Sequence, residues 1–225
     1  MKVILLPGLD GTGRLLADIS RVLSDKHAVT VFSYPLELTS YEQLGDWLDQ
    51  RLPHEPYIIV AESFSGPLAI RIALQQPPSL KGIVFVATFA RPPWKAPFWL
   101  FQWLRYVQFF PTLAAWLSGP FVFGRDGTTM VRSTYRDVLR EVPFRALLDR
   151  ISAIQRLDDN PDLSRITLPC IYLQASRDRL VPPAFATDFT PCCGPPIPVD
   201  APHFLLQTNY PEAAKQIDSF MSKLV

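Results

Sequence analysis

Short apolar runs alternate with amphipathic stretches along most of the chain. The runs are rich in β-branched and aromatic residues and show little internal alternation of polar and apolar positions. This pattern is typical of strands that are buried on both faces of a parallel sheet. It predicts six strands, at Val3–Leu6, Ala28–Phe32, Tyr57–Ala61, Gly82–Ala87, Cys170–Ala175 and Pro196–Val199.

The stretches between these runs carry apolar residues at helical spacing. They predict helices at Arg14–Ser24, Tyr41–Arg51, Phe64–Gln75, Pro183–Phe189 and Pro211–Leu224. Because strands and helices take turns along the chain, we expect an α/β fold with a mostly parallel, six-stranded sheet and helices on both of its faces.

The alternation stops at Arg91 and resumes near Leu168. We therefore expect an α/β core made of residues 1–90 and 157–225, with residues 91–156 inserted as a helical cap over the active site. Residues 91–124 hold 11 aromatic residues, among them four of the five Trp. Aromatic residues can simply build the core of a cap, but this number exceeds what a small cap needs. We expect some of them to line an apolar substrate site, and the predicted substrate-binding residues are Trp94, Trp99, Trp103 and Phe109.

Composition narrows the function classes. The chain has 225 residues, 48% of them hydrophobic, and a net charge of +1 at pH 7. It has enough apolar material for a core and lacks the basic excess of a nucleic-acid-binding protein. No apolar run is long enough for a membrane span or a secretory leader, so a cytoplasmic location is expected. The three Cys are expected to be reduced and inert, since the adjacent Cys192 and Cys193 match neither a CxxC redox motif nor a zinc site.

Ser63 stands at the junction of a predicted strand and a predicted helix. A sharp strand-to-helix turn exposes a nucleophilic Ser at its apex and needs small residues two positions before and after it. Ala61 and Ser65 meet that need. The amide of Phe64 would then lie at the start of the helix, where it could donate to an oxyanion.

Two alternatives remain on this segment alone. Ser63 or Ser65 could serve as the N-cap of the helix. Ser65 could also be the nucleophile, but Pro67 would then occupy a small-residue position, so we favour Ser63.

A glycine-rich loop, residues 7–13, follows the first predicted strand; we refer to it as the oxyanion loop. Its sequence, PGLDGTG, lacks the Lys of a phosphate-binding GxxxxGK[ST] loop, and Leu16 stands where a GxGxxG motif needs its last Gly. We expect the loop to aim the Leu9 amide at the space above Ser63. Together with the Phe64 amide it would form a two-donor oxyanion hole.

A serine nucleophile needs a base, and the chain has three His. His27 and His54 each precede a predicted strand and would lie at the amino edge of the sheet, away from Ser63. His203 follows the last predicted strand, which places it at the carboxyl edge beside Ser63. Asp178, in the loop after Cys170–Ala175, is at the same edge and could orient the base; a salt bridge to a flanking Arg is the alternative for this carboxylate.

Taken together, these segments resemble the α/β-hydrolase superfamily, in particular its small bacterial serine esterase-like members. The resemblance covers nearly the whole chain and rests on Leu6–Gly13, Ala61–Gly66, Ser176–Pro182 and Ala201–Phe204. It implies a triad of Ser63, Asp178 and His203, which follow one another in the order of that fold. The sequence departs from the family pattern in three respects. Pro7-Gly8 replaces His-Gly, both elbow Gly are replaced, and the chain begins at the third of the usual eight strands, which implies a trimmed six-stranded sheet.

The resemblance implies a serine hydrolase that cleaves small carboxylic esters through an acyl-enzyme, with no cofactor and no metal. Alternatives are a thioesterase or acyltransferase that uses CoA- or carrier-protein-linked acyl groups, and a non-catalytic binding protein of the same fold. Residues 91–156 hold ten Lys or Arg and four Asp or Glu, whereas the rest of the chain is acidic. A basic cap could steer an anionic acyl carrier, or it could be an ordinary solvated helix face.

Overall fold

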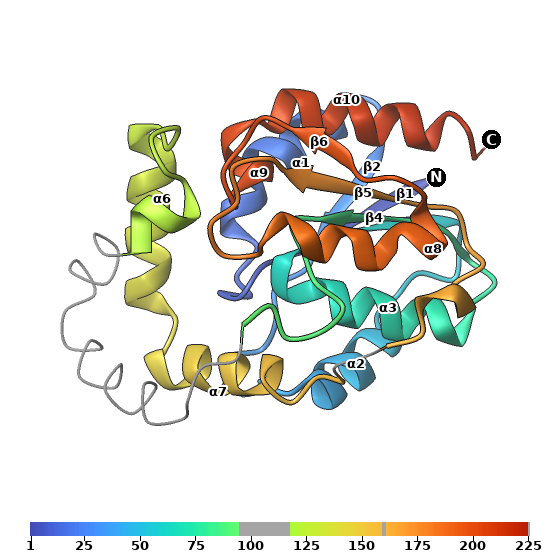
Figure 1. The fold of residues 1–225 in the computed structure, drawn as a ribbon, viewed down its shortest axis with the longest axis horizontal. Coiled ribbons are helices and arrows are strands. Elements are labelled where there is room, and N and C mark those ends of the chain that lie inside the picture. The colour runs from blue at the N-terminus through green and yellow to red at the C-terminus, as the bar shows by residue number, and fades with distance from the viewer. Residues whose placement is uncertain (95–117, 159–160, 225) are drawn as a thin grey trace.

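The described strands form one parallel sheet. The computed structural model describes residues 1–94, 118–158 and 161–224. Its strands are β1 (Lys2–Leu6), β2 (Ala28–Val31), β3 (Tyr57–Glu62), β4 (Leu80–Val86), β5 (Cys170–Ala175) and β6 (Ile197–Val199). They lie in the order β2-β1-β3-β4-β5-β6, and every neighbouring pair is parallel (Figure 1). Each predicted run is a strand to within two residues at its ends, so the predicted parallel α/β sheet is confirmed.

The strand order reverses beside β1. The chain first adds β2 on one side of β1 and then β3 on the other. The register pairs Leu6 with Ala61 and Glu62 with Val86, so the carboxyl ends of β1, β3 and β4 are level. In open α/β sheets, ligands bind in the crevice outside the carboxyl ends of the strands at such a reversal. The loops after β1 and β3 are therefore placed to build a site.

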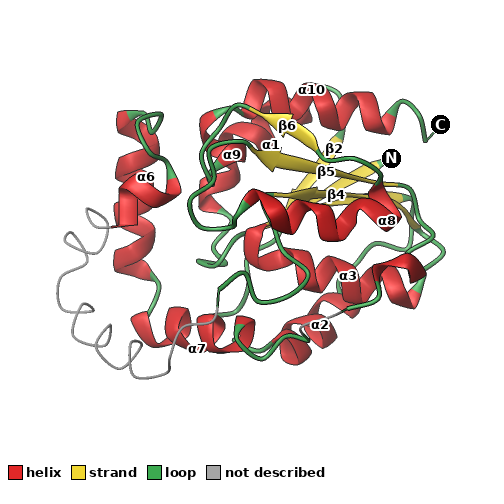
Figure 2. Ribbon diagram, viewed as in Figure 1, coloured by secondary structure: helices red, strands yellow, loops and turns green. Residues whose placement is uncertain are grey.

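Side chains of each strand alternate between two apolar layers, as the pleat requires. In β1, Val3 and Leu5 belong to one buried cluster, and Ile4 and Leu6 to the other. Helices cover both faces (Figure 2). The first cluster includes α1 (Ala17–Ser24), α9 (Leu205–Thr208) and α10 (Tyr210–Met221), and the second includes α2 (Tyr41–Asp49) and α3 (Gly66–Gln75).

Local signals decide where helices begin and what form they take. At the start of α2, the Ser40 hydroxyl accepts from the Gln43 amide and the Gln43 side chain accepts from the Ser40 amide, which is a capping box. The helix predicted at Pro183–Phe189 is a 3-10 helix, η5, that leads into α8 (Thr190–Cys193). Pro191, just beyond its end, lacks the N–H that an α-helix continuing through this position would need. The other described 3-10 helices are η1 (Arg14–Leu16), η2 (Ser63–Ser65) and η4 (Leu163–Arg165).

Between β4 and β5, the described residues are helical and contain no strand. Residues 118–122 form a helix turn, followed by α6 (Thr129–Glu141) and α7 (Phe144–Ile154). Figure 1 places α6 beyond the carboxyl ends of the strands. Its buried residues Val131, Tyr135 and Val138 share an apolar cluster with Leu15 of the core. The helical character agrees with the predicted cap at 91–156, whose boundaries stay a prediction.

Within the described ranges, no helix has both the length and the apolar character needed to cross a membrane.

The cysteine prediction is wrong for two of the three residues. Cys170, at the start of β5, and Cys193, at the end of α8, form a disulfide. Cys192 is free and half-buried, and its Sγ lies 3.6 Å from Cys193 Sγ. The spacing of the three Cys carries no signature of this bond, because the packing of α8 beside β5 creates it.

We expect the disulfide to stabilise the fold. It closes a segment with a sequence separation of 23, for which loop-closure entropy predicts a contribution of about 3 kcal/mol. Thiol titration of the denatured protein should find one thiol before reduction and three after it, and reduction should lower the Tm. Cys192→Ser is the control, and it should keep the reduction-sensitive Tm. Three free thiols without reduction would contradict the assignment.

Candidate active site

Ser63 lies at a strained turn between β3 and α3. Its φ is 47°, in the left-handed region that is costly for a residue with a Cβ. The hydroxyl of Thr88, just after β4, donates to the Ser63 carbonyl and holds the turn. Gly66 leaves space for this contact, because a Cβ at that position would collide with the Thr88 side chain. The turn has the form that the strand–turn–helix pattern predicts for an exposed nucleophile.

The structure brings the three residues of the predicted triad into one hydrogen-bonded chain. Ser63 Oγ lies 2.8 Å from His203 Nε2, and His203 Nδ1 lies 2.7 Å from Asp178 Oδ2. Asp178 Oδ1 accepts the amides of Leu180 at 2.8 Å and Val181 at 2.9 Å, which fixes the carboxylate. In this arrangement His203 can take the Ser63 proton at Nε2 while it donates from Nδ1 to Asp178.

The competing assignments for these residues receive little support. Ser65 stands at the N-cap position of α3, but its side chain makes no cap hydrogen bond. Arg177, which flanks Asp178, pairs with Asp126 and Asp200. Ser65 is fully buried, and its hydroxyl donates to the Pro7 carbonyl and contacts the Tyr34 hydroxyl. Ser65 therefore supports the loop, and its side chain is closed off from substrate.

The two other His lie where the sheet topology puts them. His27 precedes β2, and its Nε2 lies 2.9 Å from Asp218 Oδ1 of α10. His54 is exposed in the loop before β3. Both are at the amino edge of the sheet, opposite Ser63.

The oxyanion loop presents two free amides. Of the other amides in its central part, that of Gly11 donates to the Gly8 carbonyl at 3.1 Å and that of Thr12 to the Asp10 carboxylate at 2.9 Å, while Gly8 lies against the Glu62 carboxylate. The amides of Leu9 and Asp10 donate to no other described residue. Leu9 and Ser63 border the same cavity. Phe64 lies in the first turn of η2, where helical N–H groups have no partner within the helix. The residues of both predicted donors, Leu9 and Phe64, line the same cavity as Ser63.

Glu62, next to the nucleophile, is a buried carboxyl group that the sequence did not single out. Gln207 Nε2 donates to both of its oxygens, at 2.9 and 3.2 Å. The Oε1 atom of Gln207 is buried and has no partner among the described residues. Burial raises the pKa of Glu62 to about 7, and the contacts with Gln207 and the Gly8 amide oppose this shift. Glu62 can therefore change its protonation state near neutral pH.

A cavity of about 470 Å³ opens over Ser63 and His203. Its described wall is mainly apolar and comes largely from the segment between β4 and β5. The helices contribute Tyr135 and Leu139 of α6 and Leu147, Leu148, Ile151 and Ile154 of α7. Of the four aromatic residues predicted to line the site, Trp94 does so. Trp99, Trp103 and Phe109 lie outside the described residues.

The contribution of α7 was missed, although the sequence carries a signal for it. Phe144, Leu147, Leu148, Ile151 and Ile154 recur at helical spacing and share one face. The described lining contains the carboxyl groups of Asp10 and Glu62 but no Lys or Arg.

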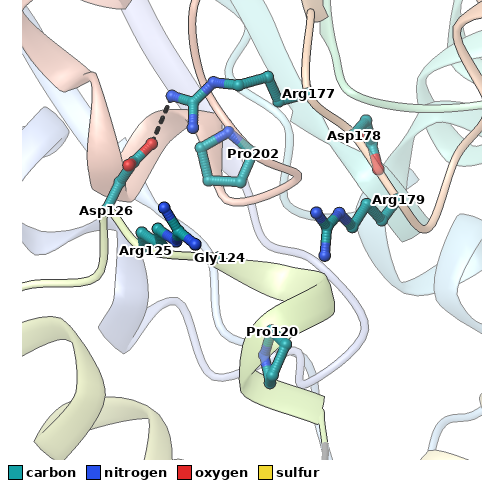
Figure 3. A pocket seen from close by; sticks show the side chains of 8 residues that line it. All are labelled: Pro120, Gly124, Arg125, Asp126, Arg177, Asp178, Arg179 and Pro202. Atoms are coloured by element: carbon teal, nitrogen blue, oxygen red, sulfur yellow. Dashed lines mark hydrogen bonds and ion pairs between the residues drawn. The ribbon is translucent and has the colours of Figure 1, made fainter.

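A second hollow, of about 780 Å³, lies on the outer side of the same wall. Figure 3 shows Arg125 and Arg179 flanking it, with Pro120 and Pro202 between them. Neighbouring residues of the same segments, such as Leu180 and His203, line the inner cavity. Arg125 and Arg179 form no ion pair with a described residue, while Arg177 of the same lining pairs with Asp126. With Asp178 also in the lining, three Arg face two Asp, which leaves a small positive excess.

Comparison with known proteins identifies relatives of this chain. The sequence model of the serine aminopeptidase S33 family matches residues 26–195. No protein of curated function matches the chain by sequence.

Several solved structures have the same fold. The enol-lactonase from Burkholderia xenovorans LB400 superposes with a TM-score of 0.83 and 18% identity, over 98% of this chain and 91% of that one. The bromoperoxidase from Bacillus anthracis gives 0.82 and 16%, over 98% and 91%. A thermophilic esterase from Thermogutta terrifontis gives 0.78 and 17%, over 100% and 90%. At these identities, the likeness shows the fold.

Glu62→Gln should change how stability depends on pH. The pKa of Glu62 is raised from 4.5 to about 7 in the folded protein, so the folded state binds the proton more tightly than the unfolded state. Wild-type stability therefore falls as pH rises from about 4.5 to 7. Gln removes this loss, so urea unfolding should show the variant gaining up to roughly 3 kcal/mol on wild type between pH 4.5 and 8. Glu37→Gln, at an exposed position, is the control. Parallel curves for wild type and Glu62→Gln would contradict the assignment.

Proposed function

The chain belongs to the serine aminopeptidase S33 family of α/β hydrolases, and from this premise we propose that it is a serine hydrolase that cleaves small carboxylic esters. The observation that carries the proposal is the hydrogen-bonded chain Ser63–His203–Asp178 at the floor of an apolar cavity. The solved structures that share the fold include an esterase and an enol-lactonase, which agrees with chemistry at an ester-type carbonyl.

In the proposed reaction, Ser63 Oγ bonds to the acyl carbon while His203 Nε2 takes the hydroxyl proton. The negative charge that develops on the carbonyl oxygen is stabilised by the amides of Leu9 and Phe64. His203 then gives its proton to the leaving alkoxide as the carbon–oxygen bond of the ester breaks. Water, deprotonated by the same imidazole, attacks the acyl carbon; the bond from this carbon to Ser63 Oγ breaks, His203 returns the proton to Oγ, and the acid is released. Asp178 orients His203 and stabilises its charged form throughout.

The cavity supports an apolar acyl group. At about 470 Å³ it can hold a small organic molecule, and its described wall offers aliphatic and aromatic surface.

The family name refers to aminopeptidases, which must recognise a positively charged amino group. The two carboxyl groups at this cavity are poor partners for such a group. One oxygen of Asp10, Oδ1, already accepts both the amide and the hydroxyl of Thr12, and Glu62 is bound by Gln207 and has a raised pKa. We therefore favour an uncharged ester.

A second candidate is a thioesterase or acyltransferase that acts on an acyl group linked to an anionic carrier. The specific observation in its favour is the outer hollow, where Arg125 and Arg179 present positive charge beside the loop that carries Asp178. The phosphates of a CoA or carrier-protein arm would find favourable charge there. The same Ser63 would be the nucleophile. A purely non-catalytic role would leave the alignment of Ser63, His203 and Asp178 without a purpose.

Covalent labelling tests the nucleophile. A fluorophosphonate should modify the protein once, at Ser63, because His203 activates this hydroxyl. Ser63→Ala should abolish both labelling and the hydrolysis of p-nitrophenyl esters. The matched control is Ser65→Ala, which removes a neighbouring hydroxyl and should still be labelled; the position is read by peptide mass spectrometry. Labelling at Ser65, or its persistence in Ser63→Ala, would refute the proposal.

Salt dependence separates the two candidate functions. Positive charge at the hollow should attract an acyl-CoA at low ionic strength, and about 1 M salt should screen this attraction. If the protein acts on carrier-linked acyl groups, kcat/KM for the acyl-CoA should drop several-fold in high salt, mainly through a rise in KM. The kcat/KM for a neutral short-chain ester should change little.

The double variant Arg125→Ala/Arg179→Ala should reproduce the effect of salt on the acyl-CoA, and Arg136→Ala, at an exposed position on α6, serves as the control. An equal salt response for both substrates would reject the carrier function and leave the ester hydrolase.

A further inference from the structure

We propose that Arg150, a buried residue of α7, is a positioning residue that holds the oxyanion loop in its reactive shape. The inference rests on the proposed function, in which the Leu9 amide of this loop stabilises the oxyanion. It assigns to the helix of the predicted cap a direct mechanical link to the reacting centre.

Arg150 is fully buried, with 0% of its surface exposed. Its Nη1 donates to the carbonyls of Leu9 at 3.0 Å and Asp10 at 2.7 Å, and its Nη2 to those of Pro35 at 3.3 Å and Leu38 at 3.5 Å. No carboxylate among the described residues forms an ion pair with it. A buried charge without a paired counter-charge is costly. The four carbonyl contacts offset part of this cost, while the buried Nε has no partner among the described residues.

Together with other hydrogen bonds, the contacts of Arg150 hold the backbone of the oxyanion loop in place. Five consecutive carbonyls, from Pro7 to Gly11, each accept a hydrogen bond. The donors are the Ser65 hydroxyl to Pro7, the Gly11 amide to Gly8 at 3.1 Å, Arg150 to Leu9 and Asp10, and the Tyr34 amide to Gly11 at 2.7 Å. The two central carbonyls thus depend on a side chain from another part of the chain.

Fixing a carbonyl also fixes the amide of the same planar peptide unit, because the N–H points the opposite way. Arg150 draws the Leu9 carbonyl toward α7 and so turns the Asp10 amide away from it. The Leu9 amide shares its peptide unit with the Gly8 carbonyl, which the Gly11 amide holds. Arg150 supports this turn from Gly8 to Gly11 by anchoring the carbonyls of its two middle residues, Leu9 and Asp10. Neither amide donates to another described residue, so both remain free to face the cavity.

The fit between the guanidinium and the loop is close. Gly11 has a φ of +73°, and a Cβ there would collide with the Arg150 guanidinium. The guanidinium also lies 5.9 Å from the centre of the Tyr34 ring, and the Tyr34 hydroxyl is 2.6 Å from Ser65 Oγ in the nucleophile turn. Arg150 therefore touches the oxyanion loop directly and the nucleophile turn through one intermediate residue.

One helix consequently does two things. Leu147, Leu148 and Ile151 of α7 line the acyl cavity, and Arg150 of the same helix holds the oxyanion loop. A substrate that seats well against α7 would stabilise the helix position that keeps the oxyanion donors aligned.

The test compares Arg150→Met, Arg150→Lys and the control Arg145→Met, whose side chain is 91% exposed on the same helix. Loss of alignment of one oxyanion donor should lower kcat about 10²-fold and leave KM within about threefold, because the acyl cavity is intact. The inhibition constant of a boronic acid that forms a tetrahedral adduct should rise in parallel with the loss of kcat/KM. Arg150→Lys keeps the charge but can serve fewer carbonyls, so its loss should be smaller. Arg145→Met should behave like wild type.

A second readout does not depend on catalysis. Amide hydrogen exchange of peptides that cover residues 7–13 should rise at least tenfold in Arg150→Met and less in Arg150→Lys, with the strands unchanged. If wild type is labelled at Ser63 but Arg150→Met keeps both its kcat and its slow exchange, the inference fails alone. If wild type shows neither labelling nor turnover, the proposed function fails, and the exchange data still decide whether Arg150 orders the loop. If Arg150→Met does not fold, Arg150→Lys becomes the deciding variant. Wild-type kcat together with wild-type hydrogen exchange at residues 7–13 in Arg150→Lys would then overturn the inference.

Discussion

The left-handed turn at Ser63 is the constraint on which the rest of the site depends. Such a conformation costs about 1–3 kcal/mol for a residue with a Cβ, and it persists because the neighbouring strands hold it. Ala87, at the end of β4, also has a positive φ, of 44°, and this turn brings Thr88 over the Ser63 carbonyl. The Tyr172 hydroxyl of β5 donates in turn to the Thr88 carbonyl at 2.7 Å. Strain at the nucleophile is thus balanced by hydrogen bonds from two adjacent strands, and it places Ser63 Oγ within reach of His203.

Buried polar groups gather beneath the oxyanion loop rather than in the cavity that would hold substrate. Glu62 and Gln207 lie against Gly8, and Arg150 lies against the next two carbonyls. Burial makes such contacts strong when they are satisfied and costly when they are not. The loop therefore has one well-defined shape, which is what an oxyanion hole requires, since its donors must be in place before charge develops.

The excess of basic residues in the inserted segment does not make the cavity beneath it basic. The inserted segment is basic in sequence, yet its arginines face several environments. Arg150 is hydrogen-bonded to backbone carbonyls, Arg91 pairs with Asp188, and Arg125 borders the outer hollow. The inner cavity contains no Lys or Arg in its described wall. The net charge of a segment therefore does not give the polarity of the site that the segment covers, because the direction of each side chain decides whether its charge reaches that site.

The parallel sheet, the turn at Ser63 and the sheet edge on which each His lies could all be predicted from the residues, because they follow from local periodicity and from the direction of parallel strands. The Cys170–Cys193 bond, the Glu62–Gln207 pair and the position of Arg150 depend on how the chain packs. Their separations along the chain are 23, 145 and, for Arg150 to Leu9, 141 residues. Neither spacing nor periodicity extends over such distances, and the partners meet only where packed layers bring them together.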